Sequence, residues 1–255
     1  MENTPLEIRE LFHLHFLRQL SQRLQGRSWA VKGGICLRFF HRSPRFSQDM
    51  DLDVLPQVEA GTLQNAVDQI LDGRSLPASL GPFGVARLRI SRPKQTPTTQ
   101  RWKVALVLSE ETALPTKVEF SRRRKTLPYT SGLPDAELLR RYRLVPFAAQ
   151  FYDAGQMAAQ KITALASSSR YAVRDLFDLH HLFFTVLAEP EEVAQMVEPG
   201  SIEQAADKIR AFTHQDFKQQ VLPYLTETLA DLYRKPASFE KLQSEAEEAL
   251  IRMMP

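Results

Sequence analysis

Cysteine is almost absent from this chain: Cys36 is the one cysteine among 255 residues. A single thiol cannot form an internal disulfide, so a disulfide-stapled scaffold is excluded and a reducing cytoplasm is expected. Because Ile35 and Leu37 flank Cys36, we expect a buried structural thiol rather than a nucleophile. No apolar run is long enough to span a bilayer, and we expect neither a membrane association nor a signal peptide in the polar N-terminal segment.

The chain also lacks internal repeats, low-complexity tracts and a strong net charge. Its formal charge is +3, with 43% hydrophobic and 25% charged residues, which is typical of a globular protein. Basic residues nevertheless cluster in the run SRRRK at 121–125 and again between Arg38 and Arg45. Such clusters are compatible with a nucleotide or RNA partner, although basic runs are also common on solvated faces.

What the chain does contain is an unusual acidic stretch, SQDMDLDVL, at residues 47–55. Carboxylates alternate with apolar residues, which predicts a strand with Asp49, Asp51 and Asp53 on one face. Like charges on one strand face repel each other, so a cation is expected nearby, and Mg²⁺ prefers such oxygen ligands. The alternative is a solvated edge strand whose charges deter aggregation.

The stretch upstream favours a site over that alternative. Residues 29–34 (WAVKGG) read as a short strand that ends in a glycine pair, and residues 35–40 read as a short buried helix. Gly33 and Gly34 let backbone N–H groups approach a phosphate at a helix N-terminus. A strand, a glycine turn, a helix and an acidic strand therefore predict one compact phosphate- and metal-binding unit.

Three further strands are predicted at 86–90, 102–108 and 116–120, with amphipathic helices at 6–24 and 60–71. Glu119 lies on a strand that could neighbour the aspartate strand, where it would supply a third carboxylate to a metal. Alternatively, Glu119 forms an ordinary cross-strand pair with a lysine on a wet face.

The pattern changes near residue 135. Residues 121–135 contain basic residues, two prolines and a glycine, and the chain beyond them is almost all helical. We therefore predict an α+β fold, with a small mixed-sheet core at 1–135 and a mostly helical half at 136–255. The expected helices are 153–167, 172–184, 191–197, 202–212, 217–233 and 238–253. On the second of these, Asp175 and Asp178 share a face, and a local pair between Asp175 and Arg174 is one reading.

Five motifs in this order resemble the AbiEii/AbiGii toxin family of nucleotidyltransferases, which includes MenT-like toxins, within the DNA polymerase β-like superfamily. They are VKGGICLRFF, RFSQDMDLDV, TKVEFSRR, the lysine of AAQKITAL, and SSRYAVRDLFDLHHL. Two positions depart from the family pattern: Ile35 replaces a hydroxyl residue after the glycine pair, and Gln160 replaces a glutamate before the lysine.

The resemblance implies roles for particular residues. Asp49 and Asp51 match the metal-binding pair, with Asp51 and Asp53 as the alternative register, and Glu119 matches the third carboxylate. Lys161 matches the lysine that holds the triphosphate and is counted with these three acids as catalytic. The expected nucleotide-binding residues are Lys32, Gly33, Gly34, Ser47, Lys161, Arg174 and Asp178.

The same resemblance implies a function. We expect a cytoplasmic toxin that uses Mg²⁺ or Mn²⁺ to transfer NMP from an NTP to an acceptor, with a tRNA 3′ end as the expected acceptor and a cognate antitoxin as partner. Transfer to a small molecule or to a protein side chain is an alternative. A catalytically inactive nucleotide- or RNA-binding module is another, although Asp49, Asp51 and Glu119 are all retained.

Overall fold

The computed structural model describes residues 3–254. The chain divides into two compact units, one made of the chain up to Phe40 together with Phe46–Tyr152, the other of His41–Arg45 together with the chain from Asp153 onward. The predicted boundary at residue 135 lies earlier than this division. Residues 136–152 belong to the first unit because Tyr142 Oη donates a hydrogen bond to Glu10 there and a short strand at Ala149–Phe151 pairs with the sheet.

The first unit is built on a seven-stranded mixed sheet whose strand order is β3-β4-β5-β2-β1-β7-β6. Strands β1 and β2 are antiparallel, whereas β2 and β5 are parallel, as are β1 and β7. The strands are β1 (Trp29–Lys32), β2 (Met50–Val54), β3 (Val85–Gln95), β4 (Thr99–Leu108), β5 (Ala113–Ser121), β6 (Thr130–Gly132) and β7 (Ala149–Phe151).

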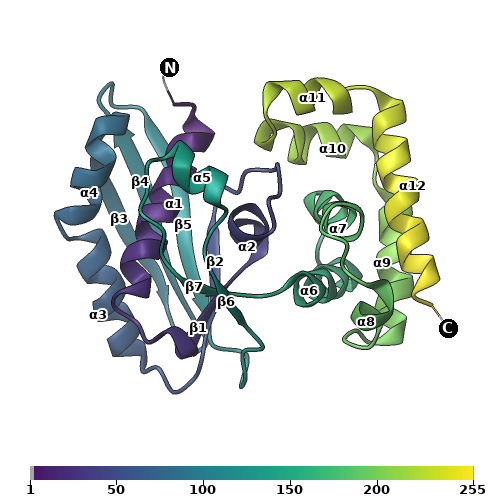
Figure 1. Ribbon diagram of the computed structural model, residues 1–255, viewed down its shortest axis with the longest axis horizontal. Coiled ribbons are helices and arrows are strands. Elements are labelled where there is room, and N and C mark those ends of the chain that lie inside the picture. Colours follow the sequence, from purple (N-terminus) through teal and green to yellow (C-terminus); the bar gives the residue numbers. More distant parts are fainter. Residues whose placement is uncertain (1–2, 255) are drawn as a thin grey trace. The chain divides into compact units, whose positions relative to one another are not determined.

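Helices α1, α3 and α4 pack against one another on one face of this sheet (Figure 1). The buried side chains of β4 and β5 point toward them, and Trp102 Nε1 donates a hydrogen bond to Asp68 on α3. The helices and helical turns of this unit are α1 (Pro5–Ser21), η1 (Gly26–Ser28), α2 (Gly33–Phe40), α3 (Ala60–Leu71), α4 (Ser75–Leu80), η2 (Gly81–Phe83) and α5 (Ala136–Arg141).

The opposite face of β3, β4 and β5 carries the alternate residues, which are mostly charged and partly exposed. Strand β3 extends through Pro93, well beyond the predicted 86–90. Proline is tolerated here because β3 is an edge strand, and the register shifts between Ser91 and Lys94. The connection between β3 and β4 is therefore only a tight turn around Thr96–Thr99.

The second unit is helical, and α6, α7, α9 and α12 pack on one another. The predicted helix 217–233 is broken in the structure by the turn η3, because Pro223 cannot donate the helical hydrogen bond. The elements are α6 (Ala154–Ala166), α7 (Arg174–Phe184), α8 (Pro190–Ala194), α9 (Pro199–Ala211), α10 (His214–Gln220), η3 (Leu222–Tyr224), α11 (Glu227–Tyr233) and α12 (Pro236–Arg252).

The predicted α+β class, with a mixed-sheet core followed by helices, is confirmed. Among the described residues, no helix has the length and apolar character needed to cross a membrane.

Candidate active site

Three carboxylates meet where β2 and β5 lie side by side. The parallel register pairs Asp51 directly with Glu119, and Asp49 immediately precedes β2 on the same face. Neighbouring strands are about 4.8 Å apart, so this register alone brings the three side chains together. The sequence predicted both the strand alternation and the neighbouring position of Glu119.

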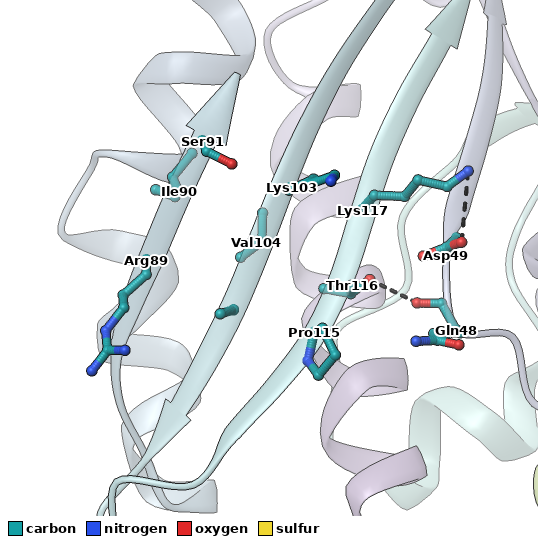
Figure 2. Close-up of a pocket in the computed structure, with 11 residues that line it drawn as sticks. Gln48, Asp49, Arg89, Ile90, Ser91, Lys103, Val104, Pro115, Thr116 and Lys117 are labelled. Atoms are coloured by element: carbon teal, nitrogen blue, oxygen red, sulfur yellow. Dashed lines mark hydrogen bonds and ion pairs between the residues drawn. The ribbon is translucent and has the colours of Figure 1, made fainter. Parts of the chain in front are cut away.

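The ammonium of Lys117 lies among these acids. Lys117 Nζ is 3.6 Å from Asp49 Oδ2, 3.6 Å from Asp51 Oδ1 and 3.9 Å from Glu119 Oε2. Figure 2 shows the lysine reaching from β5 toward Asp49. Arg101 on β4 also pairs with Glu119. Burial raises the pKa of Asp49, and Lys117 acts against that shift.

Sequence reasoning did not assign Lys117 or Arg101 to the site. The alternation of Lys117 and Glu119 on one strand face was a usable signal for the lysine. Arg101 enters through the antiparallel pairing of β4 with β5, which places it opposite Glu119. A pairing between residues far apart in the chain cannot be read from local periodicity.

Asp53 lies on the same strand but in a closed environment. Its carboxylate accepts hydrogen bonds from Lys32 Nζ at 2.5 Å and Tyr152 Oη at 2.8 Å, and Arg124 Nε lies 3.3 Å away. The Asp53 side chain is only 2% exposed, compared with 37% for Asp49 and 36% for Asp51. The open pair is therefore Asp49 and Asp51, and the predicted nucleotide-binding residue Lys32 is bonded to Asp53.

The glycine pair stands beside the acids. Gly33 opens α2 with φ at +67°, in the left-handed region that favours glycine. A Cβ at Gly33 would lie 3.4 Å from Asp51 Oδ2. The N-terminus of α2 thus begins next to Asp51, on the β1 side of the carboxylates, where backbone N–H groups can meet an anion.

The loop before β2 is held by its own hydrogen bonds. Ser47 Oγ donates to the backbone oxygen of Asp49 at 3.0 Å, so this predicted nucleotide-binding residue shapes the acidic turn. Thr116 Oγ1 donates to the backbone oxygen of Gln48 and therefore accepts from His13 Nε2, at 2.8 Å. His13 is thereby fixed as a core residue under β5.

The other predicted residues belong to the helical unit, in a second, buried cluster. Lys161 Nζ donates to Asp175 Oδ1 at 2.6 Å and to Asp178 Oδ2 at 2.5 Å. Arg45 binds Asp178 through two parallel hydrogen bonds at 2.9 and 2.8 Å. These two cations hold the pKa of Asp178 well below its usual range.

Arg174 does not join that cluster. It is exposed, and Asp175 pairs instead with Arg170, whose Nε lies 2.9 Å from Asp175 Oδ2. The local pair of Arg174 with Asp175 considered from sequence is therefore wrong. The first turn of α7 directs Arg174 outward while Asp175 is buried, and Arg170 approaches from the preceding loop.

The donor chemistry at β2 and β5 suits a hard divalent cation. Within residues 3–254, no group of three or more acidic, histidine or cysteine side chains has the geometry of a metal site. The carboxylates at β2 and β5 are instead arranged around Lys117. The three carboxylates nevertheless converge on one cationic atom, Lys117 Nζ, and carboxylate oxygens are the ligands that Mg²⁺ prefers. A metal that replaced the ammonium would find its ligands on two adjacent strands.

A sheet that carries paired carboxylates beside a glycine-opened helix, followed by a helical unit, defines a nucleotidyltransferase-like protein. A family model described as "Nucleotidyl transferase AbiEii toxin, Type IV TA system" matches residues 15–244. The chain therefore belongs to this family of nucleotidyltransferase toxins, and the resemblance seen in the motifs is confirmed.

Two solved structures share the fold. MenT4, a nucleotidyltransferase toxin of Mycobacterium tuberculosis H37Rv, is 16% identical with a TM-score of 0.61, over 98% of this chain and 94% of that one. JHP933 of Helicobacter pylori is 15% identical with a TM-score of 0.56, over 99% of this chain and 95% of that one. Among curated protein sequences, none matches the chain with statistical significance.

Proposed function

We propose that this nucleotidyltransferase uses a divalent metal, Mg²⁺ or Mn²⁺, to transfer NMP from an NTP to the 3′ end of a tRNA. One observation carries the proposal: Asp49, Asp51 and Glu119 surround a single cationic atom at distances of 3.6 to 3.9 Å. Two carboxylates on one strand with a third on its neighbour suit a site for phosphoryl transfer, where catalysis rests on positioning and charge neutralisation.

Asp49, Asp51 and Glu119 would hold the metal. When bound, it would neutralise charge on the triphosphate and polarise the attacking hydroxyl. The burial of Asp53 and its three hydrogen-bonding or ionic partners support Asp49 and Asp51 as the metal pair.

The other residues would position the reactants. Backbone N–H groups of Gly33 and Gly34 would bind phosphate oxygens at the start of α2. Glu119 would accept the proton of the attacking hydroxyl. The hydroxyl oxygen would bond to the α-phosphorus while pyrophosphate leaves. Lys161, Arg174 and Asp178, and the contribution of the helical half at 136–255 to nucleotide binding, rest on the family motifs alone.

The setting follows from the family. A toxin of a type IV toxin–antitoxin system implies a cognate antitoxin. We place the reaction in the cytoplasm, where NTPs and tRNA occur together. The exposed residues of the basic run at 121–125, Arg123 and Lys125, favour an RNA acceptor over a small molecule or a protein side chain.

The test incubates the purified protein with Mg²⁺, each labelled NTP in turn and bulk tRNA. Label in RNA with one NTP is expected, and an Asp49→Ala/Asp51→Ala variant should abolish it. Asp53→Asn is the matched comparison: it should reduce stability, while the fraction that remains folded should still transfer.

Three other outcomes would redirect the proposal. Label on protein would move the acceptor to a side chain, and label on a small molecule would exclude the tRNA. Intact NTP binding without transfer to any acceptor would favour a binding module.

A further inference from the structure

The open face of β3, β4 and β5 carries two ordered rows of side chains that lead away from the carboxylates. In the first row Ser91, Lys103 and Lys117 are directly opposite one another on three adjacent strands. In the second row Arg89 is opposite Ala105, and Ala105 is opposite Pro115. A cationic row thus runs beside a row with a small apolar centre.

A pocket of about 450 Å³ follows these rows. It is lined by Gln48 and Asp49 at one end, by short segments of β5 and β4, and by residues 89–91 of β3. Figure 2 shows this order of strands, with Arg89 on the far strand and Asp49 next to Lys117. Because β3 is the edge strand, the pocket connects the carboxylates with the edge of the sheet.

One cation along the pocket, Lys103, lacks a balancing carboxylate among the described residues, whereas Lys117 lies among the three carboxylates of the site. Lys103 is exposed, and within the described part of the chain no carboxylate pairs with it. It stands directly opposite Lys117, an unfavourable arrangement for two like charges. Arg89 has only an exposed contact with Glu111 at 3.4 Å, which contributes little. An anion lying along this face would supply Lys103 with the counter-charge that it lacks.

The sheet order gives the two sides of the carboxylates different roles. Gly33 and the start of α2 lie on the β1 side of β2, whereas Glu119 and the pocket lie on the β5 side. In an in-line displacement the attacking and leaving oxygens lie on opposite sides of the phosphorus. If the triphosphate is bound beside Gly33, the pocket on the β5 side is left for the acceptor RNA.

The geometry points to the β3–β4–β5 pocket as the track for the single-stranded 3′ end of the RNA acceptor. This inference rests on the proposed function. Lys103 and Arg89 contact backbone phosphates, a preceding nucleoside lies over Ala105 and Pro115, and the terminal nucleoside lies at the Asp49 end of the pocket with its hydroxyl toward the carboxylates. From β3 to Asp49 beside β2 the track crosses three strand spacings, about 14 Å, which is enough for a few nucleotides of single-stranded RNA.

The experiment measures binding of a fluorescent RNA hairpin with a short single-stranded 3′ overhang, without NTP, over a series of salt concentrations. The logarithm of the association constant falls with the logarithm of the salt concentration, and each lost phosphate contact should make this negative slope shallower by about 0.7. We expect about that change for Lys103→Gln, about twice it for the Lys103→Gln/Arg89→Gln double variant, and recovery for Lys103→Arg.

Arg74→Gln is the matched control, because it removes the same charge from an exposed residue before α4, away from the pocket. Its slope should equal that of the wild type. A blunt-ended hairpin should compete less well than the overhang for wild-type protein, and the Lys103→Gln variant should lose that preference. Thermal melting checks that each variant is folded.

The outcomes separate this inference from the proposed function. If the wild type transfers label to RNA but Lys103→Gln keeps the wild-type slope and overhang preference, the track is wrong and the reaction stands. If the wild type binds no RNA and labels a protein, both the track and the RNA acceptor are overturned.

Discussion

The molecule contains two clusters of acids and cations that differ in how tightly they are closed. On the sheet, Lys117 lies 3.6 to 3.9 Å from three carboxylates, and Asp49 and Asp51 are each more than a third exposed. In the helical unit, Lys161 and Arg45 bind Asp178 at 2.5 to 2.9 Å, and Asp178 is fully buried.

This difference separates a cluster that can exchange its cation from one that cannot. Loose, partly hydrated pairs contribute little to stability, so a substrate or metal can replace the lysine at small cost. Buried pairs are stable only as complete sets, because each remaining charge would otherwise be left without a partner. Exchange of the cation is therefore expected at the sheet, while the ion pairs of Asp178 in the helical unit stay intact.

The largest expected effect comes from breaking the closed cluster. Asp178→Ala leaves Lys161 and Arg45 buried without their shared carboxylate and should lower the free energy of unfolding by about 3–5 kcal/mol. Urea denaturation measures this change. Asp207→Ala, which breaks the exposed pair with Arg210, is the control and should have little effect. Equal stability of the two variants would contradict the assignment.

The free energy of unfolding of the first unit should fall at acid pH because of a buried histidine in its core. Burial and Arg9 lower the pKa of His13 to about 3, and its Nδ1 has no hydrogen-bond partner. The unfolded histidine titrates near pH 6.5, so between these values the unfolded state binds the extra proton and stability falls as pH falls. The contribution lost by pH 4 is on the order of 3 kcal/mol.

Urea denaturation at pH 7 and pH 4 measures that loss, and His13→Gln should flatten the pH dependence. The same measurement on His181→Gln in the helical unit is the comparison, because burial also lowers the pKa of His181. An unchanged pH dependence in His13→Gln would show that His13 does not carry the effect.

The smallest effect on stability is expected at the open cluster. Lys117→Met should change the free energy of unfolding by less than about 1 kcal/mol, because the replaced pairs are loose and partly exposed. It should tighten Mg²⁺ binding several-fold, since the ammonium no longer competes for the carboxylates. Calorimetric titration measures the affinity, with Lys241→Met as the control. Weaker Mg²⁺ binding would show that Lys117 supports the site.

The sequence was most informative where alternation and motif coincide. The period-two pattern around Asp51 predicted the strand and its open face, and the class of fold followed from the change of pattern after the sheet. It could not predict that Arg101 would stand opposite Glu119 or that Arg45 would bind Asp178, because both contacts depend on pairings between distant segments. Proline positions had mixed value: Pro223 broke a predicted helix, while Pro93 was accommodated on an edge strand.

The short segment His41–Arg45 has a consequence for dissecting this protein. It belongs to the helical unit although the residues on both sides belong to the sheet unit, so the chain passes between the units three times. No single cut yields two complete halves. A fragment that begins at Asp153 keeps Asp178 but loses Arg45, and the complementary fragment carries Arg45 without its carboxylate. Reassembly of the two fragments in solution should therefore depend on the Arg45–Asp178 pair. The pair can serve to control the association of split versions of this toxin.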